Sequence, residues 1–185
     1  MSIKITTLVE NSVYGKGLQG EHGLSLLVDT GEHRLLFDTG ASDLFIRNAR
    51  ILGIDLKEVD FLVLSHGHRD HTGGLHHFLA VNDKAQVICK RELFRPKFKD
   101  ERENGVMQPN ALDSTRFRFV DEVTELCRGV FVFPQLPVTD EEDTHFEHFF
   151  TWTEGRKQAD TFTDELALVL KQGVEVSVLS ACSHR

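Results

Sequence analysis

One stretch of the chain is more informative than any other: Phe61-Leu62-Val63-Leu64-Ser65-His66-Gly67-His68-Arg69-Asp70-His71-Thr72-Gly73-Gly74. Four apolar residues lead into three histidines and one aspartate within six positions, and a Gly-Gly pair follows. Imidazole nitrogen and carboxylate oxygen are ligands that suit Zn²⁺, and also Fe or Mn. Because the side chains of an extended segment alternate with a period of two, His66 and His68 fall on the same side and can bind one ion.

Asp70 and His71 come just after these two histidines, where the chain turns, and can reach a second ion beside the first. Two such ions can share a hydroxide, generate it at neutral pH and polarise a substrate oxygen. A lone histidine is more often a surface or core residue than a ligand. Four ligand-type residues at this spacing, directly after a buried-looking strand, are instead typical of metal binding.

The rest of the chain alternates between strand and helix patterns. Hydrophobic periodicity predicts strands over residues 3–9, 24–28, 34–38, 61–64, 85–89, 116–120, 129–133, 166–170 and 174–180. It predicts helices over 44–52, capped by Ser42, over 75–81, and over 91–97, ending near Pro96. The stretch 99–115 is expected to be an excursion. This order indicates an α/β fold in which two β-sheets pack face to face with helices outside.

Several further segments carry a family resemblance. They are Lys4-Ile5-Thr6-Thr7-Leu8-Val9-Glu10-Asn11, Glu21-His22-Gly23-Leu24-Ser25, Leu36-Phe37-Asp38-Thr39-Gly40, Asn48, Leu52-Gly53-Ile54-Asp55, Asp164-Glu165-Leu166-Ala167-Leu168 and Cys182-Ser183-His184. Together with the histidine-rich stretch they resemble the metallo-β-lactamase superfamily. The branch they resemble holds the dihydropterin/ribofuranosylaminobenzene-phosphate synthases and their metal-dependent hydrolase relatives. The resemblance covers essentially the whole chain and implies one αβ/βα sandwich domain over residues 1–185.

Two residues far from the motif are added to the candidate site. His184 follows the predicted strand 174–180 just as His66 follows the strand 61–64, so strand ends placed side by side would bring the two imidazoles together. The alternative is a frayed C-terminal histidine. The resemblance implies that Asp38 is the carboxylate that orients a histidine ligand and fixes its tautomer. Asp70 is the catalytic candidate, because it can orient the attacking water.

The remaining histidines and cysteines have less specific patterns. His22 matches the branch pattern and is a candidate pocket residue, whereas His33 is expected at the surface and His76 and His77 are expected to be non-ligands. His145 and His148 follow an acidic run, so a solvated loop is expected there. Cys89 and Cys127 are expected to be small buried hydrophobes. For Cys182, which lies close to His184, a buried structural thiol and a role at the site both stay open.

The end of the sequence departs from the family pattern. Relatives continue past Cys-Ser-His with further strands and helices, including a segment expected to supply the last ligand of the second metal, whereas this sequence stops at Arg185. The resemblance therefore predicts a C-terminally short sandwich that lacks these elements, with a weaker second metal site. Apolar surface left open in this way favours self-association, so a homo-oligomer is a possible state.

Composition limits the classes of partner and compartment. The chain has 185 residues, a net charge of −8 and a pI near 5.7, which is typical of one globular domain and disfavours a nucleic-acid partner. No apolar run is long enough for a membrane span, and the N-terminus lacks the apolar stretch of a signal peptide. We therefore expect a cytoplasmic protein with a small-molecule substrate.

Three functions of different classes follow. The favoured one is a metal-dependent, di-zinc hydrolase that acts through a metal-bound hydroxide, or a related pterin-type transferase; Fe or Mn can replace zinc. His66, His68 and His184 hold one ion in this hypothesis, and Asp70 and His71 help hold another. The first alternative is a protein that binds metal but is catalytically incomplete. The second is a nuclease-type relative, which the negative charge disfavours.

Overall fold

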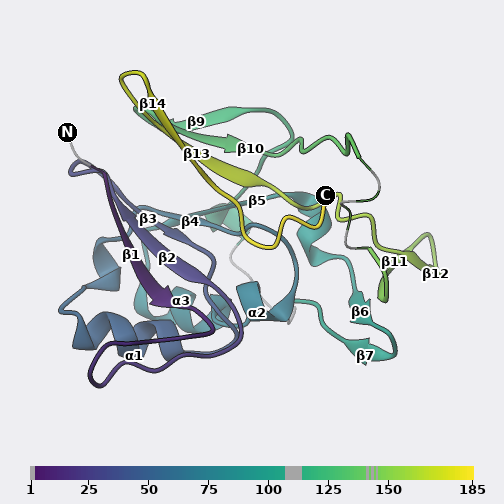
Figure 1. The fold of residues 1–185 in the computed structure, drawn as a ribbon, viewed down its shortest axis with the longest axis horizontal. Helices are drawn as coiled ribbons and strands as arrows, with labels where there is room; N and C mark the ends of the chain where they lie inside the picture. The colour runs from purple at the N-terminus through teal and green to yellow at the C-terminus, as the bar shows by residue number, and fades with distance from the viewer. Residues whose placement is uncertain (1–2, 107–113, 141, 143, 145) are drawn as a thin grey trace. The chain divides into compact units, whose positions relative to one another are not determined.

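The computed structural model describes residues 3–106, 114–140, 142, 144 and 146–185 (Figure 1). It divides into two compact units. The first unit comprises the described parts of residues 1–64, 69–88 and 107–118. The second comprises residues 65–68 and 89–106 and the described parts of 119–185. The histidine-rich stretch is therefore divided, since Ser65 to His68 belong to the second unit and Asp70 and His71 to the first.

The first unit contains a six-stranded sheet. Only the last residues of its strands β5 and β8, Cys89 and Phe119, are assigned to the second unit. The strands of the sheet lie in the order β1 (Lys4–Val9), β2 (Ser25–Asp29), β3 (Arg34–Phe37), β4 (Phe61–Val63), β5 (Gln86–Cys89) and β8 (Phe117–Phe119). The pairs β1–β2 and β2–β3 are antiparallel, and the pairs β3–β4 and β4–β5 are parallel. Leu36, Leu62 and Val87 lie in register across the parallel strands and are fully buried, as expected for the centre of such a sheet.

Short helices accompany this sheet. They are α1 (Leu44–Ile51), η1 (Leu56–Glu58), α2 (Arg69–Thr72), α3 (Leu75–Val81) and η3 (Ser114–Arg116). The apolar faces of α1 and α3 bury Phe45 and Phe78 completely. Gly74, where α3 begins, lies so close to Phe45 that an added Cβ would be 2.6 Å from its ring. The turn after the histidine-rich stretch is therefore packed directly against α1.

Two four-stranded antiparallel sheets form the second unit. One has the order β14 (Glu175–Leu179), β13 (Ala167–Gln172), β10 (Val130–Phe133) and β9 (Thr124–Cys127). The other has the order β12 (Arg156–Ala159), β11 (Phe149–Thr153), β6 (Lys97–Lys99) and β7 (Arg102–Glu103), and η2 (Arg91–Phe94) precedes β6. The long hairpin of β13 and β14 turns at Gly173, whose φ of 60° suits a residue without a side chain.

Most predicted elements are present, but some predictions are wrong. The stretch 99–115 is not only an excursion, because β6 and β7 pair within residues 97–103. The predicted helix over 91–97 is a 3-10 helix that ends at Phe94, because Pro96 follows and the chain continues into β6. The N-cap of α1 is Asp43 and not Ser42, although the Ser42 hydroxyl still accepts from the Leu44 amide at 3.1 Å.

Candidate metal centre

Three buried imidazoles lie together in the second unit. His66, His68 and His184 have exposed fractions of 0%, 3% and 8%, and one possible ligand atom from each lies within 4.8 Å of the other two. Their ring centroids are 4.7 to 5.2 Å apart. The structure therefore brings His184 to the two motif histidines, as the sequence predicts. His184 is buried, so the alternative of a frayed histidine at the chain end does not hold.

Two phenylalanine rings pack against this cluster. Phe162 is stacked on His184 with 3.8 Å between ring centroids and 9° between planes, and Phe149 is stacked on His68 at 4.8 Å. Phe162 is fully buried and has a φ of 51°, which is a strained conformation for a bulky side chain. These apolar rings exclude water from one side of the imidazoles and restrict their orientation.

The carboxylate of Asp164 holds the loop between His66 and His68 through a hydrogen bond. The Gly67 amide donates to Asp164 Oδ2 at 2.7 Å, and an added Cβ at Gly67 would lie 2.4 Å from the Leu93 carbonyl oxygen. Only glycine fits this approach. Directly before the loop, Ser65 Oγ lies 2.9 Å from His66 Nδ1, so Nε2 of His66 is the candidate ligand atom.

Asp164 belongs to a buried ionic triad. Lys97 Nζ lies 2.6 Å from Asp160 Oδ2 and 2.8 Å from Asp164 Oδ1, and all three side chains are at most 5% exposed. Burial by itself lowers the pKa of Lys97, but the carboxylates of Asp164 and Asp160 more than reverse this, so the pKa is raised overall. The ammonium group stays charged and compensates both buried carboxylates.

The neighbouring Glu165 holds the other side of the cluster. Its carboxylate accepts from the backbone amides of His184 and Arg185, both at 3.0 Å. Burial raises the pKa of this carboxyl group, and the two amide hydrogen bonds act in the opposite direction. Lys97, Asp160, Phe162, Asp164 and Glu165 were not predicted as site residues. For Asp164 and Glu165 the signal was present, since both lie in a segment that carries the family resemblance.

A second group of polar side chains lies in the first unit. His71 Nδ1 is 2.8 Å from Asp38 Oδ2, and both side chains are buried. His71 Nε2 is 3.3 Å from Asp70 Oδ2. Asp38 thus lies where the resemblance predicts an orienting carboxylate, in contact with a histidine of the motif. Its φ of 60° places it in the left-handed region, directly after β3, and its amide donates to the Val63 carbonyl at 2.9 Å.

The remaining histidines and cysteines discussed in the sequence analysis differ in burial and contacts. His33 is half-buried, with Nδ1 3.3 Å from Asp60, and the side chain of His148 is exposed, 3.0 Å from Asp100. His145 lies outside the described residues. Cys89 is buried, which raises the pKa of its thiol to about 12, whereas Cys127 is half-buried and not fully buried as predicted. Cys182 is exposed, so it is not a buried structural thiol.

The three-histidine cluster fits a transition-metal ion on the chemistry of its donors. Neutral imidazole is a ligand for Zn²⁺, Fe and other first-row ions, and three protein ligands are the usual set where one coordination position stays open. Burial favours the neutral form of histidine, which is the form that binds metal. The residues present therefore suit a metal ion, and the donor set does not distinguish zinc from iron or manganese.

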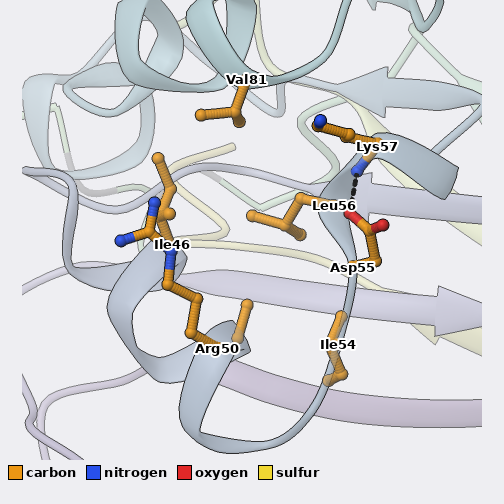
Figure 2. A pocket seen from close by; sticks show the side chains of 8 residues that line it. Ile46, Arg50, Ile54, Asp55, Leu56, Lys57 and Val81 are labelled. Atoms are coloured by element: carbon orange, nitrogen blue, oxygen red, sulfur yellow. Dashed lines mark hydrogen bonds between the residues drawn. The ribbon is translucent and has the colours of Figure 1, made fainter.

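The first unit also contains a cavity that is separate from the predicted site residues. It has a volume of about 150 Å³ and is lined mainly by apolar side chains of α1, of the segment 54–57 and of Val81 (Figure 2). Arg50 and Lys57 are its only cationic lining residues, and Asp55 accepts from the Lys57 amide at 2.9 Å. It contains none of the predicted site residues.

Two known proteins are similar in sequence to nearly the whole chain. A 7,8-dihydropterin-6-methyl-4-(beta-D-ribofuranosyl)-aminobenzene-5'-phosphate synthase of Methanocaldococcus jannaschii is 28% identical over 205 residues, which cover 99% of this chain and 68% of that protein. An uncharacterised protein of the same organism is 28% identical over 185 residues, which cover 97% of this chain and 69% of that protein.

Solved structures of similar fold include the following two. Tm1679, a metal-dependent hydrolase of the beta-lactamase superfamily, superposes with a TM-score of 0.80 at 33% identity, over 99% of this chain and 67% of that one. A metallo-beta-lactamase of Cronobacter sakazakii has a TM-score of 0.56 at 17% identity, over 88% of this chain and 57% of that one, which shows the fold alone. In the part of the chain that the structure describes, no helix has the length and apolar character needed to cross a membrane.

The model of the metallo-beta-lactamase superfamily matches residues 18–164. This range contains the whole histidine-rich stretch and Asp38, and it ends at Asp164, which holds the loop between the first two histidines. The predicted sandwich fold is confirmed by the family model and by Tm1679. The chain belongs to the metallo-beta-lactamase superfamily.

Proposed function

We propose that this protein is a metal-dependent hydrolase in which His66, His68 and His184 bind one divalent transition-metal ion. The observation that carries the proposal is the cluster of three buried imidazoles whose possible ligand atoms lie within 4.8 Å of one another. Zinc is the favoured ion because three histidines are a common catalytic zinc ligand set, and iron or manganese, which the same donors would also bind, is the alternative.

A bound ion at this centre would supply Lewis acidity and lower the pKa of a water molecule. The chain's own residues then have separate tasks. His66, His68 and His184 bind, while Phe149 and Phe162 exclude bulk water from their side of the cluster. Asp164 and Glu165 hold the backbone of the ligand-bearing segments through Gly67 and His184.

Asp70 and His71 in the first unit are proposed to bind a second ion. Asp38 holds His71 through Nδ1, which fixes the tautomer in which Nε2 can bind metal. Asp70, whose side chain is 18% exposed, is proposed to orient the attacking water and to accept its proton. Because the carboxylate is partly accessible, a water molecule can reach it.

The substrate is proposed to be a small molecule. The net charge of −8 disfavours a nucleic-acid substrate, which requires cationic surface. A pterin-type group transfer is the second candidate reaction, because the synthase of Methanocaldococcus jannaschii matches 99% of this chain. In both reactions the histidine cluster would bind the ion, so the same variants test them.

The test combines metal content with turnover. Protein purified without chelator is analysed for bound metal and assayed on p-nitrophenyl esters and phosphoesters, with His68→Ala beside His77→Ala, an exposed histidine of α3, as the matched control. We expect His68→Ala to lose one equivalent of metal and its turnover, and His77→Ala to keep both. Metal without turnover on these esters would disfavour the hydrolase and favour the pterin-type transfer or the catalytically incomplete alternative. Unchanged metal content in His68→Ala would refute the site.

A further inference from the structure

His22 is not one of the metal ligands proposed above, but it contacts Asp70, which is one of them. Its Nε2 is 3.4 Å from Asp70 Oδ2, and the Nε2 of His71 is 3.3 Å from the same oxygen. Two imidazole nitrogens from segments about fifty residues apart in the sequence therefore point toward one carboxylate oxygen. Two histidines and one carboxylate form a recognised ligand set for divalent first-row metals.

Both imidazoles are oriented in the same way. The Nδ1 of His71 contacts Asp38 Oδ2 at 2.8 Å, and the Nδ1 of His22 contacts Asn11 Oδ1 at 3.1 Å. A metal-binding histidine almost always has its other ring nitrogen engaged by an oxygen in this manner, because the contact fixes the tautomer and the direction of the ring. Asn11 thus has the same geometric relation to His22 as Asp38 has to His71.

The loop that carries His22 is built to lie against Asp70. Gly23 has a φ of 140°, and an added Cβ there would lie 2.2 Å from the Asp70 carbonyl oxygen, so only glycine allows the approach. The amide of the next residue, Leu24, donates to that same carbonyl at 3.4 Å. His22 is therefore brought to Asp70 by backbone contacts and does not depend on the reach of its side chain.

The other end of this loop is anchored by Glu21. Its carboxylate accepts from the amides of Ala41 and Ser42 at 3.0 and 3.1 Å, and from the Ser42 hydroxyl at 2.7 Å. An ordered anchor on one side of His22 and a glycine contact on the other fix its backbone. The side chain itself is 84% exposed, which would leave coordination positions accessible to solvent and substrate.

We propose that His22 is a metal ligand and that it forms, with Asp70 and His71, a site for one divalent transition-metal ion. Asn11 and Asp38 orient its two imidazoles. This inference rests on the proposed metal-dependent function, since it completes the ligand set of the second ion. It assigns a role to the Glu21-His22-Gly23-Leu24-Ser25 segment, which the proposed function leaves unused.

The experiment isolates this site by removing the other one. In a His66→Ala/His68→Ala background, Zn²⁺ is titrated by calorimetry and Co²⁺ by its visible absorption, which reports coordination number without any activity assay. We expect one equivalent to bind. Adding His22→Ala should weaken its binding at least tenfold and change the Co²⁺ spectrum. Adding His33→Ala, which removes a half-buried histidine of the same unit that contacts Asp60, should change neither.

Two further measurements separate the possible failures. Asn11→Ala should weaken binding by a smaller factor than His22→Ala, and circular dichroism of the metal-free variants should match that of the background. Equal affinity and equal spectra with and without His22 would overturn the proposal, as would a background that binds no ion. The proposed function is tested independently, because its failure would appear as unchanged metal content when His68 alone is replaced in the otherwise intact protein.

Discussion

Gly67 separates the two central histidines, and its missing side chain decides how close their loop can come to the rest of the second unit. The loop passes 2.4 Å from the Leu93 carbonyl oxygen and 2.8 Å from Lys97 Cε, measured from the position that a Cβ would take. A backbone oxygen cannot move aside as a flexible side chain can. The hydrogen bond from the Gly67 amide to Asp164 depends on this approach.

We expect Gly67→Ala to lower both stability and metal affinity. The added methyl group must displace the loop, at a cost of about 1 to 3 kcal/mol, which is typical of overpacking. His66 and His68 would move with it, so binding at the three-histidine cluster should weaken. Gly31→Ala is the control, because nothing lies within 4 Å of its added Cβ and the cost there is limited to its φ of 84°. Denaturant unfolding and Zn²⁺ titration measure both effects, and an unchanged affinity in Gly67→Ala would contradict this account.

The side chains of the site differ in how well they could be predicted from the sequence. His66, His68 and Asp70 could be named because their spacing is unusual and their residue types bind metal. Lys97 could not be named, since a lysine in sequence is nearly always exposed and nothing local reveals that Asp160 and Asp164 will surround it. Its burial depends on residues more than sixty positions away.

At the scale of elements, the segment from Asp160 to Leu166 organises the cluster. It contacts the segments that carry all three histidines: Leu166 donates to the Ser65 carbonyl at 2.9 Å, Asp164 accepts from Gly67, and Glu165 accepts from His184. Phe162, in the same segment, stacks on His184. One short connection before β13 therefore holds side chains that are distant in the sequence. Its own anchor is the ion pair of Asp160 with Lys97 on β6.

We expect Lys97→Met to be strongly destabilising. Removing the ammonium group leaves two buried carboxylates without compensation, and breaking a buried ionic group in this way costs about 3 to 5 kcal/mol. Lys99→Met on the same strand is the control, because Lys99 is exposed and surface substitutions stay within about 0.5 kcal/mol. Equal free energies of unfolding for the two variants at pH 8 would show that the triad does not anchor the segment.

The same triad predicts a pH dependence. The folded-state pKa of Lys97 is raised above its ordinary value of 10.5, so its contribution is fully present below that pH and is lost as the pH rises through the folded-state value. Stability of the unaltered protein should therefore fall at strongly alkaline pH more steeply than that of Lys97→Met. Denaturant unfolding between neutral and strongly alkaline pH checks this, and parallel curves for the two proteins would contradict it.

Elements with a clear hydrophobic period were predictable, and those without one were not. The helix predicted over 75–81 is α3 with the same bounds, and the first five strands of the six-stranded sheet lie within about two residues of their predicted positions. The strand β12 has the sequence Arg-Lys-Gln-Ala and is exposed throughout, so no burial pattern could reveal it. It forms because β11 supplies a partner, which is a tertiary effect.

At the scale of the whole molecule, the candidate ligands are divided between the two units. The second unit holds His66, His68 and His184, and the first holds His22, Asp70 and His71. The family fold was predictable from the motif and its flanking segments, whereas the arrangement of each cluster required the structure. Self-association stays a prediction; Val174, Val176 and Val178 of the hairpin of β13 and β14 are among the exposed apolar side chains that could support it.

Metal binding should raise the temperature at which the protein unfolds, because the ion would join residues 66 and 68 to residue 184 within the second unit. An ion that binds only the folded state stabilises it by about 4 kcal/mol when its free concentration is a thousand times its Kd. For a chain of this length each kcal/mol corresponds to roughly 2 to 4 °C in Tm, so adding a chelator should lower Tm by about 8 to 16 °C. His184→Ala removes the ligand from the distant segment, and its Tm should respond much less to the chelator. His148→Ala, an exposed histidine of the same unit, should respond like the unaltered protein. If the chelator left the Tm of the unaltered protein unchanged, or lowered that of His184→Ala equally, the cluster would not be the site at which metal binding and folding are linked.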